Sequence, residues 1–514
     1  MSARGNVLEK PKAKKAAANS KKPFLNYIDG VWKKASSGRF FADVNPASTH
    51  ELIGIFPESG PQDINEAVEA AHKSYAEWHL VPPPKRADLI LRSGLILEER
   101  KEELAKVMTR EMGKVLKETR GDIQEAIDTA FYVAGEGRRL FGQTTTSELK
   151  NKMAMTVRMP IGVCGIITPW NFPIAVPSWK IYPALLCGNT IIFKPAEDTP
   201  ASASLFVEIF EKAGFPPGVI NLVHGGPSTG ELIVNHSGIQ LISFTGSTEV
   251  GRIIGEKCGR LLKKCSLEMG GKNAQIVMED ANLDLAIEAA LWGAFGTSGQ
   301  RCTATSRLIV HEKVFDAFRK KLVERAKALR LGNGLKQGTD LGPVINHSQQ
   351  EKIDYYVKLG IKEGARLECG GSIPKGPNFK NGYFFQPTIF SNVSAKMRIA
   401  QEEIFGPVTV MIKVKDFDEA IRVANDTPYG LSSSIFTQNV NGAMRAIRDI
   451  EAGITYVNSS TIGAEVHLPF GGIKNTGNGH REAGETVFDI FSEWKTVYID
   501  YSGKLQKAQI DTQE

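Results

Sequence analysis

Cys302 stands where a polar loop runs into an apolar strand. It follows the glycine-led turn 296–301 and precedes the run Leu308-Ile309-Val310. Functional residues are common on loops held by a rigid scaffold, and a cysteine becomes a nucleophile when nearby cations or dipoles favour its thiolate. We expect such neighbours around Cys302. Since free cysteine is also among the most buried residue types, this prediction depends on companion residues elsewhere in the chain.

Asn171 and Glu268 could supply two groups that a cysteine nucleophile needs. Asn171 follows a short apolar strand, where its carboxamide could donate to a developing oxyanion. Glu268 lies between Leu267 and Met269, and burial there would raise its pKa and make it a base for activating water near neutral pH. The alternative interpretations are a turn cap at Asn171 and a salt bridge between Glu268 and Lys272 or another cation.

Two stretches could bind a nucleotide. In 244–251 a strand, a turn at Gly246 and Ser247, and a helix start follow one another, and a helix N-terminus can hold a pyrophosphate through backbone N–H groups. Lys194 and Glu197 follow another strand, where a carboxylate could accept from ribose hydroxyls. Neither stretch is a G-x-G-x-x-G fingerprint or a P-loop, so each is weak evidence alone.

Other catalytic patterns are absent or incomplete. Residues 226–230 match the G-x-S-x-G elbow of serine hydrolases, but we interpret the match as a coincidence because Pro227 precedes the serine and no His/Asp pairing is evident. The nine histidines form no spacing typical of a Cys/His hydrolase, and there is no H-E-x-x-H or ligand cluster. No metal site is predicted.

The elements that must position these residues form an α/β pattern. A hairpin is predicted from the runs at 26–32 and 39–41, and amphipathic helices at 64–79, 85–107 and 123–141. Strands at 163–168, 190–193, 219–223 and 241–244 then alternate with helices at 174–186, 201–213 and 229–234. This alternation indicates a parallel, doubly wound sheet whose sites lie at the carboxyl ends of its strands.

A second α/β lobe follows Cys302. Its helices are predicted at 312–328, 347–363, 417–424 and 442–450, and its strands at 408–412, 433–436 and 454–457. A strand at 493–499 has no local partner, so it could pair with the strand at 153–158 or with another subunit.

Composition limits the class of protein. A chain of 514 residues with 42% apolar and 23% charged residues is typical of two or three globular domains. Residues 1–22 hold seven Lys or Arg and one Glu, which accounts for the whole net charge of +6, so no nucleic-acid partner is indicated. The six cysteines form no CxxC pair and follow no apolar signal segment, which predicts reduced thiols and a cytoplasmic location. No apolar run of about 18 residues occurs, so no membrane span is expected.

Seven motifs, in one order, resemble those of the aldehyde dehydrogenase superfamily. They are Pro169-Trp170-Asn171-Phe172-Pro173, Lys194-Pro195-Ala196-Glu197, 244–251, 267–272, Gly299-Gln300-Arg301-Cys302, 402–407 and Pro469-Phe470-Gly471-Gly472. The resemblance covers residues 24–500 and implies a Rossmann-like cofactor-binding domain, an α/β catalytic domain and a small β oligomerisation flap. The implied limits are 24–146 with 163–270 for NAD binding, 271–483 for catalysis and 147–162 with 484–503 for the flap, between a disordered basic tail at 1–23 and a C-terminal tail at 504–514.

The resemblance also implies roles for matching residues. Cys302 would attack an aldehyde, Asn171 and the Cys302 backbone N–H would hold the oxyanion, and Glu268 would activate the water that releases the acid from a thioester. Lys180 matches a position near the catalytic centre. The implied cofactor contacts are Trp170, Lys194, Glu197, Gly226, Gly246, Ser247, Glu403 and Phe405. Because Glu197 would repel a 2′-phosphate, NAD is predicted rather than NADP.

The substrate implied by the resemblance is an aldehyde. Its pocket would be lined by Phe172, Val176, Trp179, Arg301 and Phe470. Details around 132–139 and 302–307 are similar to 2-oxoglutarate-semialdehyde dehydrogenases, and a carboxylate on the substrate would need a cation such as Arg138, Arg139 or Arg301. A homodimer or homotetramer built by strand pairing is expected.

The leading hypothesis is therefore an NAD-dependent aldehyde dehydrogenase. A cofactor-independent thiol esterase or hydrolase could use the same Cys302 and Glu268, but it would not need the pyrophosphate turn or the Lys194 and Glu197 pair. A non-enzymatic relative would not need Cys302, Glu268 and Asn171 intact, and coenzyme-A-acylating relatives usually lack the water-activating glutamate.

Overall fold

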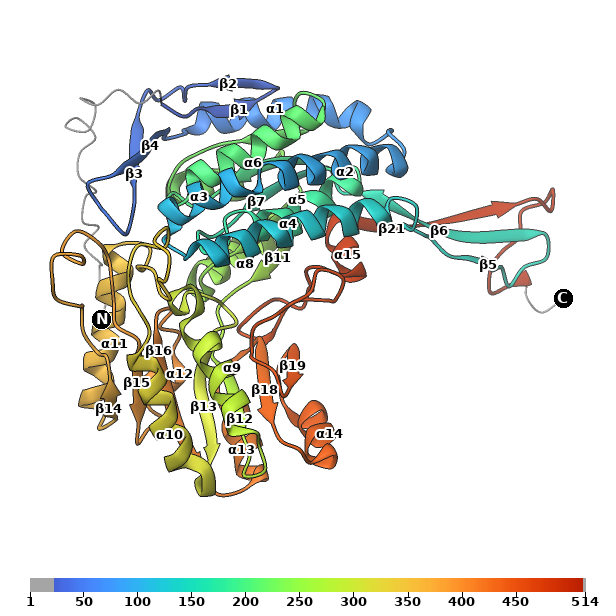
Figure 1. The fold of residues 1–514 in the computed structure, drawn as a ribbon. Coiled ribbons are helices and arrows are strands. Elements are labelled where there is room, and N and C mark those ends of the chain that lie inside the picture. The colour runs from blue at the N-terminus through green and yellow to red at the C-terminus, as the bar shows by residue number, and fades with distance from the viewer. Residues whose placement is uncertain (1–22, 512–514) are drawn as a thin grey trace.

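A computed structural model describes residues 23–511, which form two lobes and a projecting arm (Figure 1). Each lobe contains a seven-stranded sheet. The predicted tail at 1–23 lies, apart from its last residue, outside the described residues. No helix within 23–511 is long and apolar enough to cross a membrane.

The first sheet has the strand order β11-β10-β7-β8-β9-β1-β2. Five neighbouring strands are parallel: β11 (Lys264–Glu268), β10 (Leu241–Thr245), β7 (Val163–Ile167), β8 (Thr190–Lys194) and β9 (Ile220–Leu222). The last four were predicted, and β11 was not. The antiparallel strands β1 (Asn26–Ile28) and β2 (Val31–Lys33) extend its far edge.

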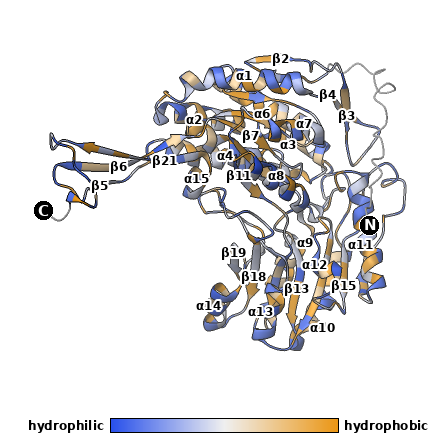
Figure 2. Ribbon diagram, turned by 180° about the vertical axis from the view of Figure 1, so that it is seen from behind, coloured by the Kyte–Doolittle hydropathy of each residue, from blue (hydrophilic) through white to orange (hydrophobic). Residues whose placement is uncertain are grey.

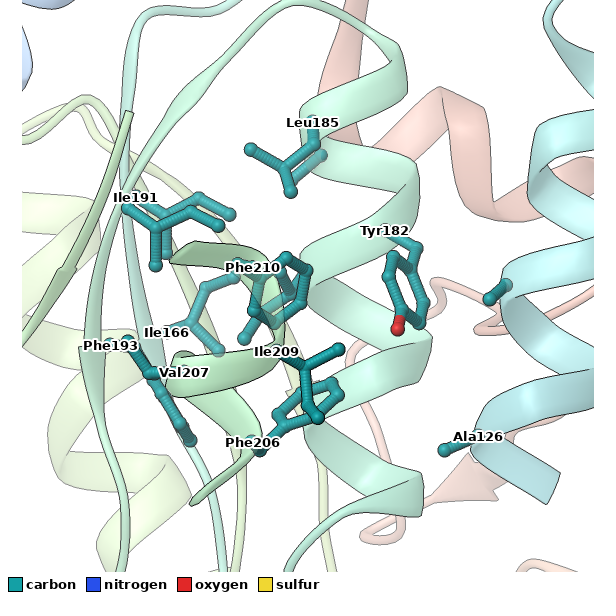
Figure 3. Close-up of a cluster of buried hydrophobic side chains, with 14 of the residues drawn as sticks. Ala126, Ile166, Tyr182, Leu185, Ile191, Phe193, Phe206, Val207, Ile209 and Phe210 are labelled. Atoms are coloured by element: carbon teal, nitrogen blue, oxygen red, sulfur yellow. The ribbon is translucent and has the colours of Figure 1, made fainter. Parts of the chain in front are cut away.

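Helices cover both faces of this sheet. One face packs on α1 (Pro61–Trp78), α7 (Pro227–Asn235) and α8 (Thr248–Arg260), and the other on α5 (Ala175–Leu186) and α6 (Pro200–Ala213), with α2 (Pro83–Glu99), α3 (Lys101–Met112) and α4 (Leu116–Glu136) outside them. Helix α5 is apolar on all sides because it lies between the sheet and α4. Tyr182 of α5 meets Phe206 and Phe210 of α6 at ring distances of 6.1 and 5.5 Å (Figure 3).

The second sheet has the order β14-β15-β16-β13-β12-β18-β19, and all its strands except β14 are parallel. They are β14 (Arg366–Cys369), β15 (Thr388–Ser391), β16 (Val408–Val414), β13 (Thr305–His311), β12 (Asn273–Val277), β18 (Ser432–Phe436) and β19 (Ile454–Val457). Helices α9 (Leu283–Phe295) and α10 (Glu312–Lys327) cover one face, and α11 (His347–Lys362), α12 (Arg398–Gln401), α13 (Phe417–Asn425) and α14 (Val440–Asp449) the other. Figure 2 shows hydrophobic residues in the strands of both sheets.

The arm is a three-stranded antiparallel sheet of β21 (Ser492–Asp500), β6 (Lys152–Pro160) and β5 (Thr144–Thr146), joined to the lobes after α15 (Phe488–Phe491). The predicted pairing of 493–499 with 153–158 is therefore confirmed within one chain. Two small ladders complete the fold: β3 (Phe40–Val44) with β4 (Leu52–Pro57), and β17 (Tyr429–Gly430) with β20 (Ile473–Lys474).

Two predictions about the N-terminal region are wrong. The hairpin does not join 26–32 to 39–41, because a turn at Asp29 and Gly30 pairs β1 with β2 and leaves β3 to pair with β4. The helix predicted at 85–107 is two helices, since the chain leaves helical geometry at Arg100, whose guanidinium binds Glu103 and Glu208.

Candidate active site

The site lies between the two sheets. The strands of the first sheet reach it with their carboxyl ends, and those of the second sheet with their amino ends. In the first sheet, β7 and β8 end just before Asn171 and at Lys194, and β11 ends at Glu268. In the second sheet it is the beginning of β13, at Thr305, that follows Cys302. The prediction that the polar motifs lie at carboxyl ends of strands therefore holds for the first sheet, whereas the cysteine approaches from the amino end of the second.

The loop that carries Cys302 is held in a constrained conformation. Thr297 and Ser298 both have a φ of 53° and Gly299 one of 69°, a left-handed turn that persists only where its surroundings fix it. The Gln300 side chain donates to the Thr297 carbonyl at 3.2 Å and accepts from the Ile345 N–H at 2.9 Å. These bonds hold the backbone that presents the cysteine.

Asn273 fixes the other side of the same loop. Its amide nitrogen donates to the carbonyls of Cys302 at 2.7 Å and Ala304 at 2.9 Å, while its oxygen accepts from the Ser432 N–H at 3.0 Å. A Cβ at Gly271 would lie 2.4 Å from the Cys302 carbonyl oxygen, so only glycine lets β12 approach this closely.

Of the cationic or dipolar neighbours that we predicted for the Cys302 thiol, the structure shows the dipolar ones, the N–H groups of Thr303 and Cys302. Burial raises the pKa of the thiol to about 12, and the Glu403 and Glu268 carboxylates add to this, while the Thr303 and Cys302 N–H groups oppose it. The predicted dipoles therefore act on the thiol, but burial and the two carboxylates outweigh them. The charges nearest to the sulfur are acidic, because the loop lies between two glutamates from different lobes.

Asn171 lies directly beside this loop. It is buried, and its amide nitrogen donates to the Gln300 carbonyl at 3.0 Å. A carboxamide has two N–H groups, and this bond uses one of them. The geometry leaves the second N–H as a donor close to Cys302.

Glu268 is a buried carboxyl without a hydrogen-bond donor among the described residues. Burial and the nearby Glu482 raise its pKa well above the usual range, with Lys180 and Arg481 opposing the shift. A Cβ at Gly471 would lie 2.8 Å from Glu268 Oε1, so the glycine-rich stretch near the C-terminus encloses the carboxyl. The alternative of a salt bridge to Lys272 is wrong, because Lys272 Nζ donates to the Glu402 carbonyl at 2.7 Å.

Lys180 forms a buried ion pair with Glu482 and donates to the Ser243 hydroxyl at 3.0 Å. Sequence reasoning missed Glu482, since the two partners lie 302 positions apart. This pair lies behind Glu268, and both of its charges act on the Glu268 carboxyl.

Glu403 faces the thiol from the second lobe. Its Oε1 accepts from the Gly271 N–H at 2.9 Å, and a Cβ at Gly270 would lie 2.5 Å from its Oε2. Burial raises the pKa of Glu403, and the Gly271 N–H opposes that shift. Phe405, two residues on, packs edge-to-face on Trp170 with ring centroids 5.4 Å apart.

An aromatic cluster lies beside the thiol. Trp179 and Phe470 meet edge-to-face at 4.8 Å, and Cys302 packs against the cluster that they form with Leu431 and Ala483. Val176, one turn before Trp179 on α5, is half-buried, and its N–H donates to the Phe172 carbonyl at 3.2 Å. These predicted pocket residues thus lie close together.

Arg301 contributes a cation to the same region. Its guanidinium carbon lies 5.2 Å from the ring centre of Phe172 and 5.0 Å from that of Trp292, and Nη2 lies 3.5 Å from Glu118. Nε donates to the Thr297 hydroxyl at 2.9 Å, and Nη1 donates to none of the described residues. Of the other two candidate anchors, Arg139 forms an ion pair with Glu136 on the surface of α4, and Arg138 follows that helix.

The predicted nucleotide-binding residues line the carboxyl edge of the first sheet. Lys194 Nζ lies 4.0 Å from Glu197 and donates to the Pro195 carbonyl, while Ser247 caps α8 by accepting from the Val250 N–H at 3.3 Å. Gly246 precedes this cap, and Gly226 caps α7. A Cβ at Gly226 would meet only Glu58 Oε1, at 3.9 Å, and the Gly226 N–H donates to the same oxygen at 3.2 Å. The donors fit a nucleotide: two helix N-termini for phosphates and a carboxylate for ribose hydroxyls.

Comparison with known proteins is consistent with this geometry. The model of the Aldehyde dehydrogenase family matches residues 32–497. The chain is 42% identical over 477 residues to an alpha-ketoglutaric semialdehyde dehydrogenase of Bacillus subtilis (strain 168), covering 93% of this chain and 98% of that protein. It is also 42% identical over 484 residues to human aldehyde dehydrogenase 1A1, covering 93% and 95%.

A solved structure has the same fold. It is a betaine aldehyde dehydrogenase of Staphylococcus aureus in complex with NAD+, with a TM-score of 0.92 and 33% identity, covering 94% of this chain and 95% of that one.

Proposed function

We propose how this chain, which belongs to the aldehyde dehydrogenase family and oxidises aldehydes with NAD, divides that reaction among its own residues. The proposal rests above all on one observation, the arrangement around the Cys302 thiol. An amide donor, an aromatic cluster and a buried carboxyl without a hydrogen-bond donor all lie around it.

Cys302 loses its thiol proton to solvent and the resulting thiolate attacks the aldehyde carbon, so that a carbon–sulfur bond forms and the carbonyl oxygen takes up negative charge. The second N–H of Asn171 and the Cys302 backbone N–H stabilise that oxygen. NAD, when bound, accepts the hydride that leaves the thiohemiacetal carbon, and its positive ring favours the thiolate. A thioester to Cys302 remains.

Glu268 completes the turnover. It takes a proton from a water molecule that attacks the thioester, the carboxylic acid leaves, and the thiol is restored. A raised pKa makes Glu268 a stronger base than an ordinary glutamate, and the absence of a hydrogen-bond donor leaves both of its oxygens available. The charges of the buried Lys180–Glu482 ion pair act on the Glu268 carboxyl.

Residues of the first lobe would bind the cofactor. Gly226, Gly246 and Ser247 bind its pyrophosphate at the starts of α7 and α8, and Trp170, Glu403 and Phe405 hold the nicotinamide end. Lys194 and Glu197 bind the adenosine ribose. Glu197 is only partly exposed, so its charge would act strongly on a 2′-phosphate. NAD is therefore preferred to NADP.

The substrate is an aldehyde that carries a carboxylate. The relative from Bacillus subtilis is named for such a semialdehyde, whereas aldehyde dehydrogenase 1A1, at the same identity, is not, so identity alone does not select the substrate. Arg301 supports a carboxylate-bearing substrate. It adjoins Cys302 and contacts the Phe172 ring, and its Nη1 can donate to a bound carboxylate. The pocket of Phe172, Val176, Trp179 and Phe470 takes the carbon chain.

Steady-state oxidation of matched aldehydes tests this function. We expect reduced cofactor to form with wild type, more efficiently with NAD than with NADP, and none with Cys302→Ala. Arg301→Leu should raise the KM of four- to six-carbon semialdehydes by about tenfold and leave uncharged aldehydes of equal length within about threefold. Equal effects on both sets of aldehydes would refute the proposal that the substrate carries a carboxylate bound by Arg301. Ester hydrolysis without cofactor-dependent oxidation would favour a thiol esterase.

The arm supports assembly into a homodimer or homotetramer. One edge of β21 is unpaired in the described chain, and Met153, Trp494, Tyr498 and Ile499 expose apolar surface there. The domain limits expected above, with 24–146 and 163–270 for NAD, 271–483 for catalysis and 147–162 with 484–503 for assembly, remain our proposal. The six cysteines are free, which supports a reducing, cytoplasmic compartment.

A further inference from the structure

Three carboxyls lie along one face of α4. Glu118, Asp122 and Glu125 are spaced four and three residues apart, which places them on one side of a helix. That side packs against α5 and reaches Arg301, the proposed substrate anchor. We call Lys114, Arg301 and these three acids the charged cluster.

Two of the three acids have partners. Glu118 accepts from the Thr297 N–H at 2.7 Å and pairs with Arg301. Asp122 accepts from Lys114 Nζ at 2.6 Å, in a pair with both side chains fully buried, and from the Ala175 N–H at 2.8 Å. These contacts hold the loop before Cys302 and the start of α5.

Glu125 is the acid that remains. It is half-buried, and no described residue donates a hydrogen bond to its carboxyl. It lies one turn along the same side of α4 as Asp122 and Glu118, the partners of Lys114 and Arg301. Both cations flank Phe172: Lys114 Nζ lies 3.9 Å above that ring and Arg301 contacts it as well. No hydrogen bond or ion pair of the described residues indicates that the Glu125 carboxyl stabilises the fold.

We propose that Glu125 is a specificity-determining residue: in its protonated form it donates a hydrogen bond to an oxo group on the carbon next to the substrate carboxylate, which Arg301 binds. The inference rests on the proposed function and names the substrate as a 2-oxo semialdehyde. A protonated carboxyl is a donor that a keto oxygen can use, whereas an ionised one would repel the adjacent substrate carboxylate.

The electrostatics of the cluster agree with a protonated Glu125. Burial raises its pKa to about 8, and Asp122 and Asp128 add to the shift, while Arg301 and Lys114 oppose it. With Glu125 neutral, two cations balance two anions in the cluster. The arrangement resembles other sites where an apolar setting keeps a carboxylic acid neutral so that it can donate.

Two substrates of equal length separate this role from a structural one. We would measure kcat/KM for 2,5-dioxopentanoate and for 5-oxopentanoate, which differ only in the oxo group, with NAD in excess. Glu125→Leu should lower the value for the oxo substrate by about tenfold or more and that for 5-oxopentanoate by less than about threefold. Glu125→Gln, which keeps a donor, should stay within about threefold on both. Glu77→Gln, the same change at an exposed position on α1, serves as the matched control.

The test compares the ratio of the two kcat/KM values. A variant that folds poorly lowers both values together and leaves this ratio unchanged. Equal losses on both substrates, or a loss in Glu125→Gln as large as in Glu125→Leu, would overturn the proposal. So would a wild-type preference for the 2-amino analogue that Glu125→Gln abolishes, because binding an ammonium needs a carboxylate. If Arg301→Leu still distinguishes charged from uncharged aldehydes while the Glu125 variants do not distinguish the oxo group, only this inference fails and the proposed function stands.

Discussion

Glu268 and Glu403 are two carboxyls that face the same thiol from different lobes, yet their surroundings differ. Glu403 is held by the Gly271 N–H at 2.9 Å and by the close backbone at Gly270. Glu268 has no hydrogen-bond donor among the described residues. Its carboxyl lies against the backbone of Gly471, and the charges of Lys180 and Glu482 act on its pKa. A hydrogen bond to the charged form favours that form, and its absence favours the neutral form. The comparison indicates that hydrogen bonding, and not residue type, assigns one carboxyl to proton transfer and the other to holding a bound group.

Replacing Glu268 should have the largest effect. Glu268→Gln keeps the size of the side chain and removes the base, so we expect steady-state turnover to fall by about 100-fold or more. Thioester formation does not need this base in our proposal. Rapid mixing should therefore show a burst of reduced cofactor close to one equivalent per active site, followed by slow turnover.

Glu403→Gln is the matched control for that experiment, because it changes the same residue type beside the same sulfur. It should raise the KM for NAD by several-fold and show no burst, since the thioester is still hydrolysed. A burst in Glu403→Gln, or the absence of one in Glu268→Gln, would reverse the roles that we assign.

The reactivity of the thiol should respond in the opposite order. Glu403 raises the pKa of Cys302 more than Glu268 does. Removing the Glu403 charge therefore favours the thiolate, and alkylation of Cys302 by iodoacetamide at pH 8 should be about threefold faster or more in Glu403→Gln, with a smaller gain in Glu268→Gln. The mass of the Cys302 peptide measures the rate. A larger gain in Glu268→Gln would contradict the geometry.

Much of this fold could be predicted from the sequence, because its sheets are regular. The strands at 163–168, 190–193 and 241–244 are short apolar runs bounded by turns, and each lies within one or two residues of its predicted limits. The break at Arg100 was not predictable, since apolar residues recur at helical spacing on both sides of it and only the φ and ψ of one residue divide α2 from α3.

The sequence allowed the main residues of the site to be predicted, but not the charges that surround them. Cys302, Asn171 and Glu268 could be selected because each ends or begins a strand in a recognisable motif. The Lys180–Glu482 pair spans 302 positions, and the two acids around the thiol come from separate lobes, so neither is visible in local patterns. The acids of α4 did leave a signal, because Glu118, Asp122 and Glu125 recur at helical spacing.

The smallest expected effect is on stability, and its dependence on pH distinguishes the two carboxyls from an ordinary one. The folded protein raises the pKa of Glu268, so the folded state binds this proton more tightly than the unfolded chain does. That contribution to stability is complete below the ordinary glutamate range and is lost as the pH rises toward the raised pKa. Glutamine cannot ionise, so Glu268→Gln escapes the loss.

The Tm of Glu268→Gln relative to wild type should therefore increase by about 1–2 °C between pH 5 and pH 8, which corresponds to about 1–2 kcal/mol for a protein of this size. Glu403→Gln should show a smaller increase, because the Gly271 N–H stabilises the charged form of Glu403 in the folded state. Glu77→Gln, at an exposed position on α1, should show none. Scanning calorimetry at matched ionic strength gives the three differences. If the Tm difference for Glu268→Gln is constant across this range, the carboxyl ionises in the fold as easily as in water, and the distinction between the two glutamates does not arise from burial.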